Sequence, residues 1–277
     1  MTNTRVSLMI PVGLFTFATS IGMVFALLHE LREYPNARIL QAMPTTTDHA
    51  IAGVTGDIPA ILCTPEGGSG PGVVLIQEIF GINDYILSVA ERLAHEGYVV
   101  LAPHMYWRIQ HPFRVDARGP EDLGPAFEIA NQHPPEDGVA DIGTALDHLR
   151  GRSDVQGGVA VMGFCFGGSM TYLAAAAHEP TCAVSYYGSM IGENLDKAPA
   201  VTCPILFHFG DDDPFLPNEH VDGLRAATEG MSNVEILVQP GAGHAFDNDK
   251  NPMFANPPAA AASWARTSEF LRTHLNA

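Results

Sequence analysis

A cysteine surrounded by glycines is the residue of this sequence whose setting most clearly suggests chemistry. Cys165 lies at the centre of Gly163-Phe164-Cys165-Phe166-Gly167-Gly168, after a short apolar run and before an alanine-rich segment. A Gly-x-nucleophile-x-Gly turn joins a strand to a helix, and its glycines let neighbouring chain pass close by. The positive end of the helix dipole favours the thiolate form of a cysteine at this place. We therefore predict that Cys165 is a nucleophile; the alternative is a small buried cysteine in a glycine-rich turn.

A nucleophilic thiol generally needs a base, and the base needs a group that orients it. His244 stands on a glycine-rich loop directly after a predicted strand. Three consecutive carboxylates, Asp211, Asp212 and Asp213, follow another predicted strand, and their mutual repulsion means that not all of them point inward. We expect His244 to be the base and one aspartate to orient it. The alternative for His244 is a surface or helix-capping histidine.

The other three cysteines have a different setting. Cys63, Cys182 and Cys203 stand in apolar, strand-like segments, which are typical of inert core cysteines. Four cysteines in 277 residues are too few for a disulfide scaffold, and the sequence has no Cys-x-x-Cys or His-Glu-x-x-His pattern. We therefore expect no metal site and no cofactor.

The charge and composition exclude several classes of protein. Lys and Arg number 14 and Asp and Glu 31, which gives a formal net charge of −17 at pH 7. Such a surface repels phosphate backbones, so we expect no nucleic-acid partner. Apolar residues make up 46% and charged residues 16% without repeats, which excludes disordered, collagen-like and coiled-coil chains.

Apolar, β-branched runs alternate with helical stretches along most of the chain. This alternation predicts an α/β fold whose mostly parallel sheet carries helices on both faces, with reactive groups at the carboxyl ends of the strands. Residues 58–63 are expected to form an edge strand, because a sheet edge tolerates Pro59. The other predicted strands are 72–76, 98–102, 159–162, 183–186, 205–208 and 234–238. The predicted helices are 83–97, with Asn83 or Asp84 as the N-cap, 122–130, 135–149, 169–177, 218–228 and 259–275.

The N-terminal residues 1–42 form an apolar extension before a domain predicted to span 43–277. No charged side chain occurs from Val6 to Leu28, and about 20 apolar residues suffice to span a bilayer as a helix. However, Pro11 and several glycines interrupt this run, and no small-residue cleavage site follows it. Three interpretations stay open: a membrane anchor or signal, an extra packed helix, or a dispensable extension before a true start at Met43. The last predicts a cytoplasmic protein, the first an anchored or exported one.

The predicted domain resembles the dienelactone hydrolase family, which are α/β-hydrolases with a cysteine nucleophile that open cyclic enol-lactones in chloroaromatic degradation. The similarity runs from about Met43 to the C-terminus and rests on four motifs in the family's order. These are Gln-Glu-Ile-Phe-Gly at 77–81, the cysteine turn at 163–168, the aspartate loop at 210–217 and the histidine loop at 242–246. The resemblance implies the α/β-hydrolase fold for this domain.

The resemblance also implies a role for individual residues. Cys165 is the nucleophile, His244 the base and Asp213 the orienting acid, with Asp211 and Asp212 as the fallback. Glu78 of the first motif is expected to hold and tune the resting thiol. In this fold the backbone N–H after the nucleophile and one from an earlier loop stabilise the oxyanion, which implies Phe166 and Ile79.

The substrate side of the resemblance is less complete. Dienelactone carries a carboxylate, and Arg108 resembles one of the family's two arginines that bind it. The second arginine is expected shortly after His244, where this chain has Asp247-Asn248-Asp249. Tyr106 and Tyr187 are expected to line an apolar substrate pocket, or else to belong to the core.

These observations predict a hydrolase that opens a lactone or activated ester through a Cys-His-Asp triad and an acyl-thioester intermediate. Its partner is a small-molecule substrate, and the chain is expected to be a monomer or a small homo-oligomer. One alternative is a general carboxylesterase or thioesterase, which the missing second arginine favours. The other alternative is a non-catalytic binding protein with the hydrolase fold.

Overall fold

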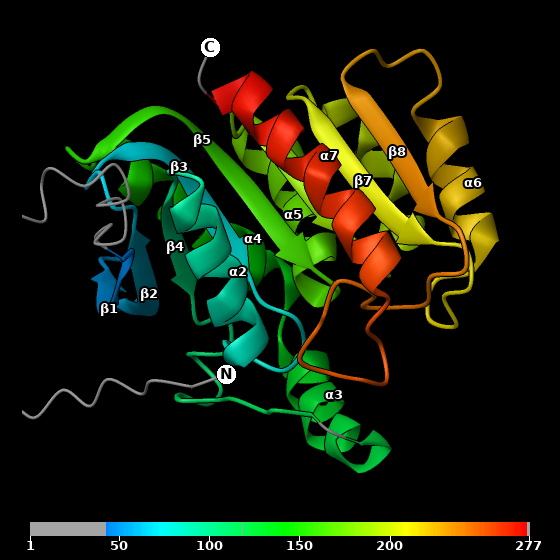
Figure 1. The fold of residues 1–277 in the computed structure, drawn as a ribbon, viewed down its shortest axis with the longest axis horizontal. Coiled ribbons are helices and arrows are strands. Elements are labelled where there is room, and N and C mark those ends of the chain that lie inside the picture. The colour runs from blue at the N-terminus through cyan, green and yellow to red at the C-terminus, as the bar shows by residue number, and fades with distance from the viewer. Residues whose placement is uncertain (1–42, 118, 276–277) are drawn as a thin grey trace, which may run out of the picture. The chain divides into compact units, whose positions relative to one another are not determined.

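A β-sheet of eight strands runs through the computed structural model, which describes residues 43–117 and 119–275 (Figure 1). The strands lie in the order β1-β2-β4-β3-β5-β6-β7-β8. Their bounds are Thr45–Ile51 for β1, Ile58–Thr64 for β2, Gly70–Ile76 for β3, Val99–Pro103 for β4, Val155–Phe164 for β5, Cys182–Tyr186 for β6, Ile205–Gly210 for β7 and Val234–Gln239 for β8.

Helices cover both faces of this sheet. One face carries α2 (Asp84–His95) and α7 (Pro257–Leu275), and the other carries α4 (Pro135–Arg150), α5 (Phe166–His178) and α6 (Asn218–Ala227) (Figure 1). Helix α3 (Leu123–Gln132) adds Ala126 and Ile129 to the core on the side of α4 and α5. Among the described residues, short 3₁₀ helices span Pro120–Asp122, Ile191–Glu193 and Leu195–Ala200. The predicted mostly parallel sheet between two helical layers is confirmed.

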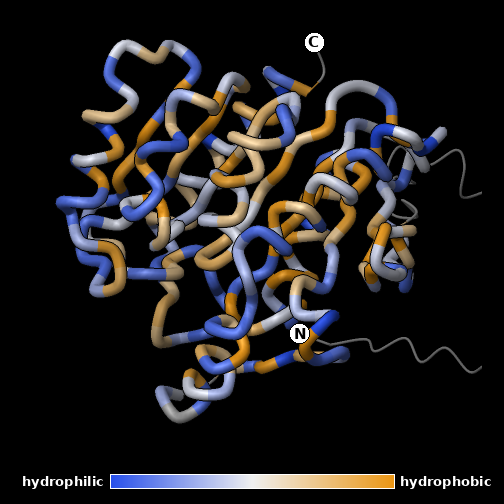
Figure 2. The backbone as a smooth tube through the Cα atoms, turned by 180° about the vertical axis from the view of Figure 1, so that it is seen from behind, coloured by the Kyte–Doolittle hydropathy of each residue, from blue (hydrophilic) through white to orange (hydrophobic). Residues whose placement is uncertain are grey.

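The continuous apolar runs of the central strands follow from burial on both faces. In β3, Val73 and Leu75 pack with the side chains of α2 and α7, whereas Val74 and Ile76 pack with those of α4 and α5. Successive side chains of a strand point to opposite faces, so a strand between two helical layers needs apolar residues at every position. Figure 2 shows the resulting concentration of hydrophobic segments along the strands between the helices.

The start of α2 shows how local chemistry sets an element boundary. Asn83 has extended backbone, and its side-chain oxygen accepts a hydrogen bond from the Ile86 N–H at 3.2 Å. This bond satisfies one of the backbone donors that lack a partner in the first turn of a helix. Asn83 is therefore the N-cap, and the predicted start of this helix is confirmed.

The strand expected at the edge of the sheet, β2, lies inside the sheet. β1 pairs antiparallel with β2 over its whole length, with Ala50 opposite Pro59, and β2 pairs on its other side with β4. β1 escaped prediction because it is rich in threonine and mostly exposed, with only Ile51 fully buried, so it lacks the apolar pattern of a strand. β2 and Pro59 are thus interior to the sheet, and β1 shields them.

The apolar segment from Val6 to Leu28, and with it the predicted extension 1–42, lies outside the described residues. Within residues 43–117 and 119–275, none of the helices combines the length and the apolar character needed to cross a bilayer.

Close packing of backbone explains the glycines around Cys165. A Cβ on Gly163 would collide with the Gly167 carbonyl, and one on Gly168 would collide with the Tyr186 carbonyl of β6. A Cβ on Gly167 would lie 2.5 Å from the Ile76 oxygen and 2.6 Å from the Gln77 oxygen. The first turn of α5 therefore touches the ends of β3, β5 and β6 directly, and this close approach fixes the place of Cys165.

We expect Gly167→Ala to lower the free energy of unfolding by about 1–3 kcal/mol, because the added methyl group meets two backbone carbonyls that cannot move independently. The matched control is Gly124→Ala in α3, where nothing lies within 4 Å of the added Cβ. This control is expected to raise stability by about 0.5–1 kcal/mol through helix propensity. Urea denaturation of both variants measures the difference; equal effects would contradict the packing described for Gly167.

Candidate active site

The candidate catalytic side chains gather where five neighbouring parallel strands end. Glu78 follows β3, Cys165 follows β5, Ser189 follows β6, Asp213 follows β7 and His244 follows β8. These strands are consecutive in the sheet, so their carboxyl ends lie at one edge. The arrangement agrees with the rule that open α/β sheets carry their sites at this edge.

Cys165 occupies a strained backbone conformation between β5 and α5. Its φ is 54° and its ψ is −116°, values that an L-residue adopts only when the surrounding structure imposes them. Its N–H donates to the Tyr186 carbonyl at 3.0 Å, and its own carbonyl accepts from the Ser169 N–H at 3.1 Å. The side chain remains partly exposed at the N-terminus of α5. Cys165 is thus accessible and lines the cavity described below.

His244 contacts both Cys165 and Asp213. Its Nε2 lies 3.1 Å from Cys165 Sγ, and its Nδ1 lies 2.7 Å from Asp213 Oδ2. The other Asp213 oxygen accepts a hydrogen bond from the Phe215 N–H at 2.8 Å, so the carboxylate is fixed in orientation. Of the three adjacent aspartates, Asp213 alone is buried; Asp211 instead accepts from the Gly241 N–H, and Asp212 is exposed.

The electrostatic surroundings of His244 favour its protonated form. Burial lowers the pKa of the imidazole, but the neighbouring Cys165 sulfur and the Asp213 carboxylate outweigh burial and raise it above its ordinary value. An imidazolium next to the sulfur stabilises a negative charge there. The arrangement is therefore suited to a thiolate–imidazolium pair.

The remaining cysteines lack such surroundings. Cys63, Cys182 and Cys203 are free and buried in the core. Burial raises the pKa of all three thiols, to about 11 for Cys203. Their predicted inertness agrees with this burial, since only the thiolate is a good nucleophile.

Glu78 is fully buried at the wall of the cavity and is held by Asn248. The Asn248 side-chain N–H donates to Glu78 Oε2 at 2.8 Å, while Oε1 has no hydrogen-bond partner among the described residues. Burial raises the pKa of Glu78 to about 7, although His244 and the bond from Asn248 both lower it. Asn248 thus lies in the segment after His244 where the resemblance leads us to expect a second substrate-binding arginine. Its side chain donates to the Glu78 carboxylate.

A polar cluster of Tyr187, Tyr85, Asp247 and Arg92 lies next to His244. Tyr187 is fully buried, its ring centroid lies 5.2 Å from that of His244, and its hydroxyl lies 3.4 Å from that of Tyr85. Tyr85 in turn donates to Asp247 at 2.8 Å, and Arg92 donates to the same oxygen at 2.9 Å. Tyr187 therefore packs against the ring of His244 and is not among the residues that line the cavity.

Backbone strain is concentrated around these groups. Within the described ranges, Cys165, Tyr187 and Ala245 are three of the four non-glycine residues with positive φ, at 54°, 38° and 54°. Such conformations each cost about 1–3 kcal/mol and cluster at functional sites. This distribution supports the assignment of the site independently of side-chain chemistry.

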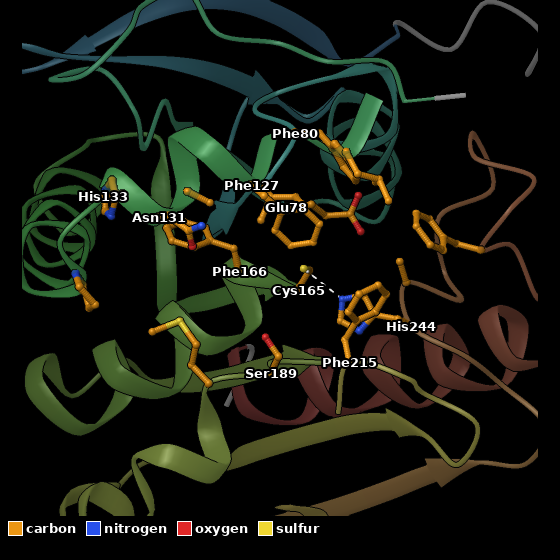
Figure 3. Close-up of a pocket in the computed structure, with 17 residues that line it drawn as sticks. Glu78, Phe80, Phe127, Asn131, His133, Cys165, Phe166, Ser189, Phe215 and His244 are labelled. Atoms are coloured by element: carbon orange, nitrogen blue, oxygen red, sulfur yellow. Dashed lines mark hydrogen bonds between the residues drawn. The ribbon is translucent and has the colours of Figure 1, made fainter. Parts of the chain in front are cut away.

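A cavity of about 430 Å³ opens beside Cys165 and His244, a size typical of small-molecule sites. Figure 3 shows the dashed contact between these two residues, surrounded by rings and apolar side chains. Glu78, Ser189 and Asn131 add polar groups to the wall. The apolar part includes Ile79, Phe80, Phe127, Phe166, Met190 and Phe254.

The structure does not place Arg108, the arginine expected to bind substrate, in the wall of this cavity. Its guanidinium forms two hydrogen bonds with the buried carboxylate of Asp141 on α4, and it lies 4.3 Å from the centroid of the Trp107 ring. Arg108 is absent from the cavity lining. It connects a loop to α4, because a buried carboxylate requires a cation of its own.

Tyr106 does not line the cavity either but packs against residues that do. Its ring is buried and lies 5.6 Å from the Phe166 ring and 5.7 Å from the His133 ring, both of which line the cavity. Phe166 and Ile79, the predicted sources of oxyanion N–H groups, do line the cavity. Phe166 is the first residue of α5, so its N–H has no acceptor within the helix.

Several lining residues escaped prediction from sequence. Phe127 and His133 belong to α3 and to the end of that helix, and nothing in their local pattern indicates that the helix passes over the cavity. Phe215 belongs to the aspartate loop 210–217, and nothing in that motif indicates that its ring lies 5.2 Å from the ring of His244. Ser189 could have been found, since it directly follows the predicted strand 183–186 and Tyr187-Gly188.

Metal ligation finds no support in the part of the chain that is described. No three or more His, Cys, Asp or Glu side chains there are grouped so as to hold a metal ion.

Comparison with known proteins identifies the family. The sequence profile described as "Dienelactone hydrolase family" matches residues 58–275. The chain belongs to the dienelactone hydrolase family. Among curated relatives, the carboxymethylenebutenolidase of Pseudomonas sp. (strain P51) is 35% identical over 217 residues, 78% of this chain and 90% of that protein. Carboxymethylenebutenolidase 1 of Cupriavidus pinatubonensis is 32% identical over 216 residues, covering 78% and 92%.

The fold of the family is also the fold of this chain. A crystal structure from Klebsiella pneumoniae assigned to the dienelactone hydrolases superposes with a TM-score of 0.72 at 28% identity, covering 81% of this chain and 96% of that one. The α/β-hydrolase fold and the assignment as a carboxylic ester hydrolase are thus confirmed. Family membership favours an enzyme over a non-catalytic binding protein.

The raised pKa of Glu78 predicts a pH-dependent effect on stability. A carboxyl whose pKa rises from 4.5 to about 7 on folding destabilises the folded state progressively between these pH values and fully above them, because the ionised form is disfavoured in the core. The gain in unfolding free energy from Glu78→Gln is therefore expected to grow by about 2–3 kcal/mol between about pH 5 and about pH 8.

Denaturant unfolding of wild type and Glu78→Gln at both pH values measures this difference. Glu91→Gln, at an exposed position of α2, is the matched control for the loss of one negative charge. A gain from Glu78→Gln that is the same at both pH values would show that the carboxyl does not titrate in this range.

Proposed function

We propose that this chain hydrolyses lactones and activated esters by covalent catalysis at Cys165. The observation that carries the proposal is the unbroken contact from Cys165 Sγ through the His244 ring to Asp213, with distances of 3.1 and 2.7 Å. These contacts support the roles of nucleophile, base and orienting acid for the three residues, of which Cys165 and His244 line the cavity.

In the first step the Cys165 thiolate attacks the carbonyl carbon of the substrate. A carbon–sulfur bond forms, and the carbonyl π electrons move to oxygen. The backbone N–H groups of Phe166 and Ile79 stabilise this oxyanion, since both residues line the cavity next to the sulfur. The charge then develops where fixed dipoles already point, including the N-terminus of α5.

In the second step the oxyanion collapses and the carbon–oxygen bond of the substrate breaks. The leaving oxygen takes the proton from the His244 imidazolium and, in a lactone, remains tethered to the acyl group. Neutral His244 next removes a proton from water, which attacks the thioester and releases Cys165 as a thiolate. Asp213 keeps the ring in the tautomer that faces the sulfur throughout.

The choice of lactones and activated esters follows from the leaving group. A thiolate is itself a good leaving group, so the tetrahedral intermediate returns to substrate unless the departing oxygen is also stable as an anion. Enol and aryl oxygens meet this condition, whereas amide nitrogens do not. The names of the carboxymethylenebutenolidase relatives support a lactone as substrate.

Glu78 takes part by its charge near the reacting groups. It lies in the wall with Cys165 and His244, and its negative charge favours the imidazolium. The hydrogen bond from Asn248 holds the carboxylate in place. We propose a positioning and electrostatic role for Glu78 and no direct proton transfer.

Variants of the three central residues test the proposal. Turnover of a simple aryl ester and of dienelactone is expected to fall at least about a thousandfold in Cys165→Ala and His244→Ala, and about a hundredfold or more in Asp213→Asn. The control is Asp211→Asn, which changes an exposed carboxylate of the same loop that contacts only backbone. Full turnover by Cys165→Ala would mean that the nucleophile is another group.

A general carboxylesterase or thioesterase is the second candidate, favoured by the absence of arginine from the described cavity wall. A panel of lactones, aryl esters, alkyl esters and thioesters separates the two. If only non-cyclic esters or thioesters react, the lactone is not the substrate while the triad remains.

A further inference from the structure

We propose that Arg92 and Asp247 are positioning residues of the active site: their ion pair fixes the loop that carries His244 and thereby keeps its imidazole in place. This inference rests on the proposed function, since it concerns how the same site is held. Arg92 and Asp247 are not among the described residues that line the cavity, so both act through other side chains.

The Asp247 carboxylate anchors the loop after β8 to helix α2. Asp247 is three residues beyond His244, and its side chain is fully buried. Its Oδ2 accepts hydrogen bonds from Tyr85 at 2.8 Å and from Arg92 at 2.9 Å, and both donors belong to α2. Removing the cation from a buried carboxylate is strongly unfavourable, so the loop is held where Arg92 reaches it.

Arg92 is itself fixed by an aromatic ring of α7, the other helix on this face of the sheet (Figure 1). Its guanidinium carbon lies 3.3 Å from the centroid of the Trp264 ring, and the Trp264 Nε1–H donates to Glu96 at 2.8 Å. A guanidinium group stacks favourably on an aromatic face. The ring therefore holds the cation in one orientation toward Asp247. Because the Arg92 side chain retains 37% exposure, it can be replaced without opening the core.

Two tyrosines connect Asp247 to the catalytic histidine. Tyr85 donates its single hydroxyl proton to Asp247, so Tyr187 is the donor in the 3.4 Å contact between the two hydroxyls. This bond orients the Tyr187 ring, whose centroid lies 5.2 Å from that of His244. The backbone of Tyr187 has a φ of 38°, a conformation that persists only where surrounding contacts hold it. A displacement of Asp247 therefore reaches the imidazole through Tyr85 and Tyr187.

The residue after Asp247 carries the same constraint to Glu78. The Asn248 side chain donates to the Glu78 carboxylate at 2.8 Å, and the Asn248 N–H donates to the Ala245 carbonyl at 2.9 Å. Ala245 has a φ of 54°, so the turn after His244 is strained and relaxes when its contacts are lost. The anchor at Asp247 thus keeps His244 and Glu78 at a fixed spacing.

The charges that face this anchor determine how it must be tested. Burial raises the pKa of Asp247, whereas Arg92 and the hydrogen bond from Tyr85 lower it. The neighbouring Asp249 raises this pKa further, and Asp247 adds to burial in raising the pKa of Glu78. Loss of Arg92 alone leaves a carboxylate without its cation close to Glu78. A variant that also removes the Asp247 charge is therefore needed to separate position from charge.

Turnover of an aryl ester by Arg92→Met is the first test. We expect kcat to fall at least about tenfold while KM changes by less than about threefold, because the reacting groups shift and the cavity wall does not. Arg92→Lys retains the cation and is expected to recover most of kcat. The control is Arg225→Met, in the last turn of α6, whose partner Asp222 is exposed; its kcat is expected to stay at the wild-type value. An unchanged kcat in Arg92→Met overturns the inference.

The double variant Arg92→Met with Asp247→Leu separates positioning from stability. It removes both charges of the pair, so its free energy of unfolding is expected to exceed that of Arg92→Met. Its kcat is expected to stay at least about tenfold below wild type, because apolar side chains do not bind Tyr85 in a fixed direction. Recovery of both stability and kcat would show that the pair only stabilises the fold, which overturns the inference.

Alkylation of Cys165 by iodoacetamide needs no ester turnover and separates failure of the inference from failure of the proposed function. The other free cysteines are buried, so the accessible Cys165 reacts first. A well-placed imidazolium maintains the thiolate at lower pH, so the midpoint of the rate against pH is expected to lie at least about one pH unit higher in Arg92→Met than in wild type. A higher midpoint supports the inference even if wild type hydrolyses no ester, in which case the proposed function alone fails. The same midpoint in both proteins overturns the inference.

Discussion

The backbone conformation of Cys165 is the constraint on which the site depends. A residue at φ 54° and ψ −116° is stable only because β5 and α5 hold it from both sides, and the helix can approach the strands only because Gly163, Gly167 and Gly168 lack side chains. The same close approach directs the sulfur away from the core and brings the N-terminus of α5 beneath the reacting atoms. The close packing of the backbone therefore fixes the position of the Cys165 sulfur.

The other groups reach this sulfur because of sheet topology. Glu78 and His244 are separated by more than half the chain, yet β3 and β8 end at the same edge of the sheet. Asn248, four residues beyond His244, donates a hydrogen bond to Glu78 and so connects the segments that follow β8 and β3. The ring of Tyr187 packs against the ring of His244. Burial lowers the pKa of His244, but the Cys165 sulfur and the Asp213 carboxylate beside the ring outweigh it and favour the imidazolium.

Much of this site could be predicted from local sequence, and the reasons for the rest are physical. Cys165, Asp213 and His244 each stand in a short motif at the end of an apolar strand, where the motif and the place in a parallel sheet agree. The role of Arg108 could not be predicted, because its partner Asp141 lies 33 residues away on a helix with no distinctive pattern. β1 and the passage of α3 over the cavity were missed for the same reason: pairing and packing with distant segments decide them.

The most direct measurement is mass spectrometry of protein quenched in acid during turnover of an aryl ester. The account predicts one acyl group per chain, located on the peptide that contains Cys165 and absent from Cys165→Ala. It also predicts that the acyl group persists longer in His244→Ala, because water then lacks its base. Steady turnover with an acyl group on another side chain would contradict the account.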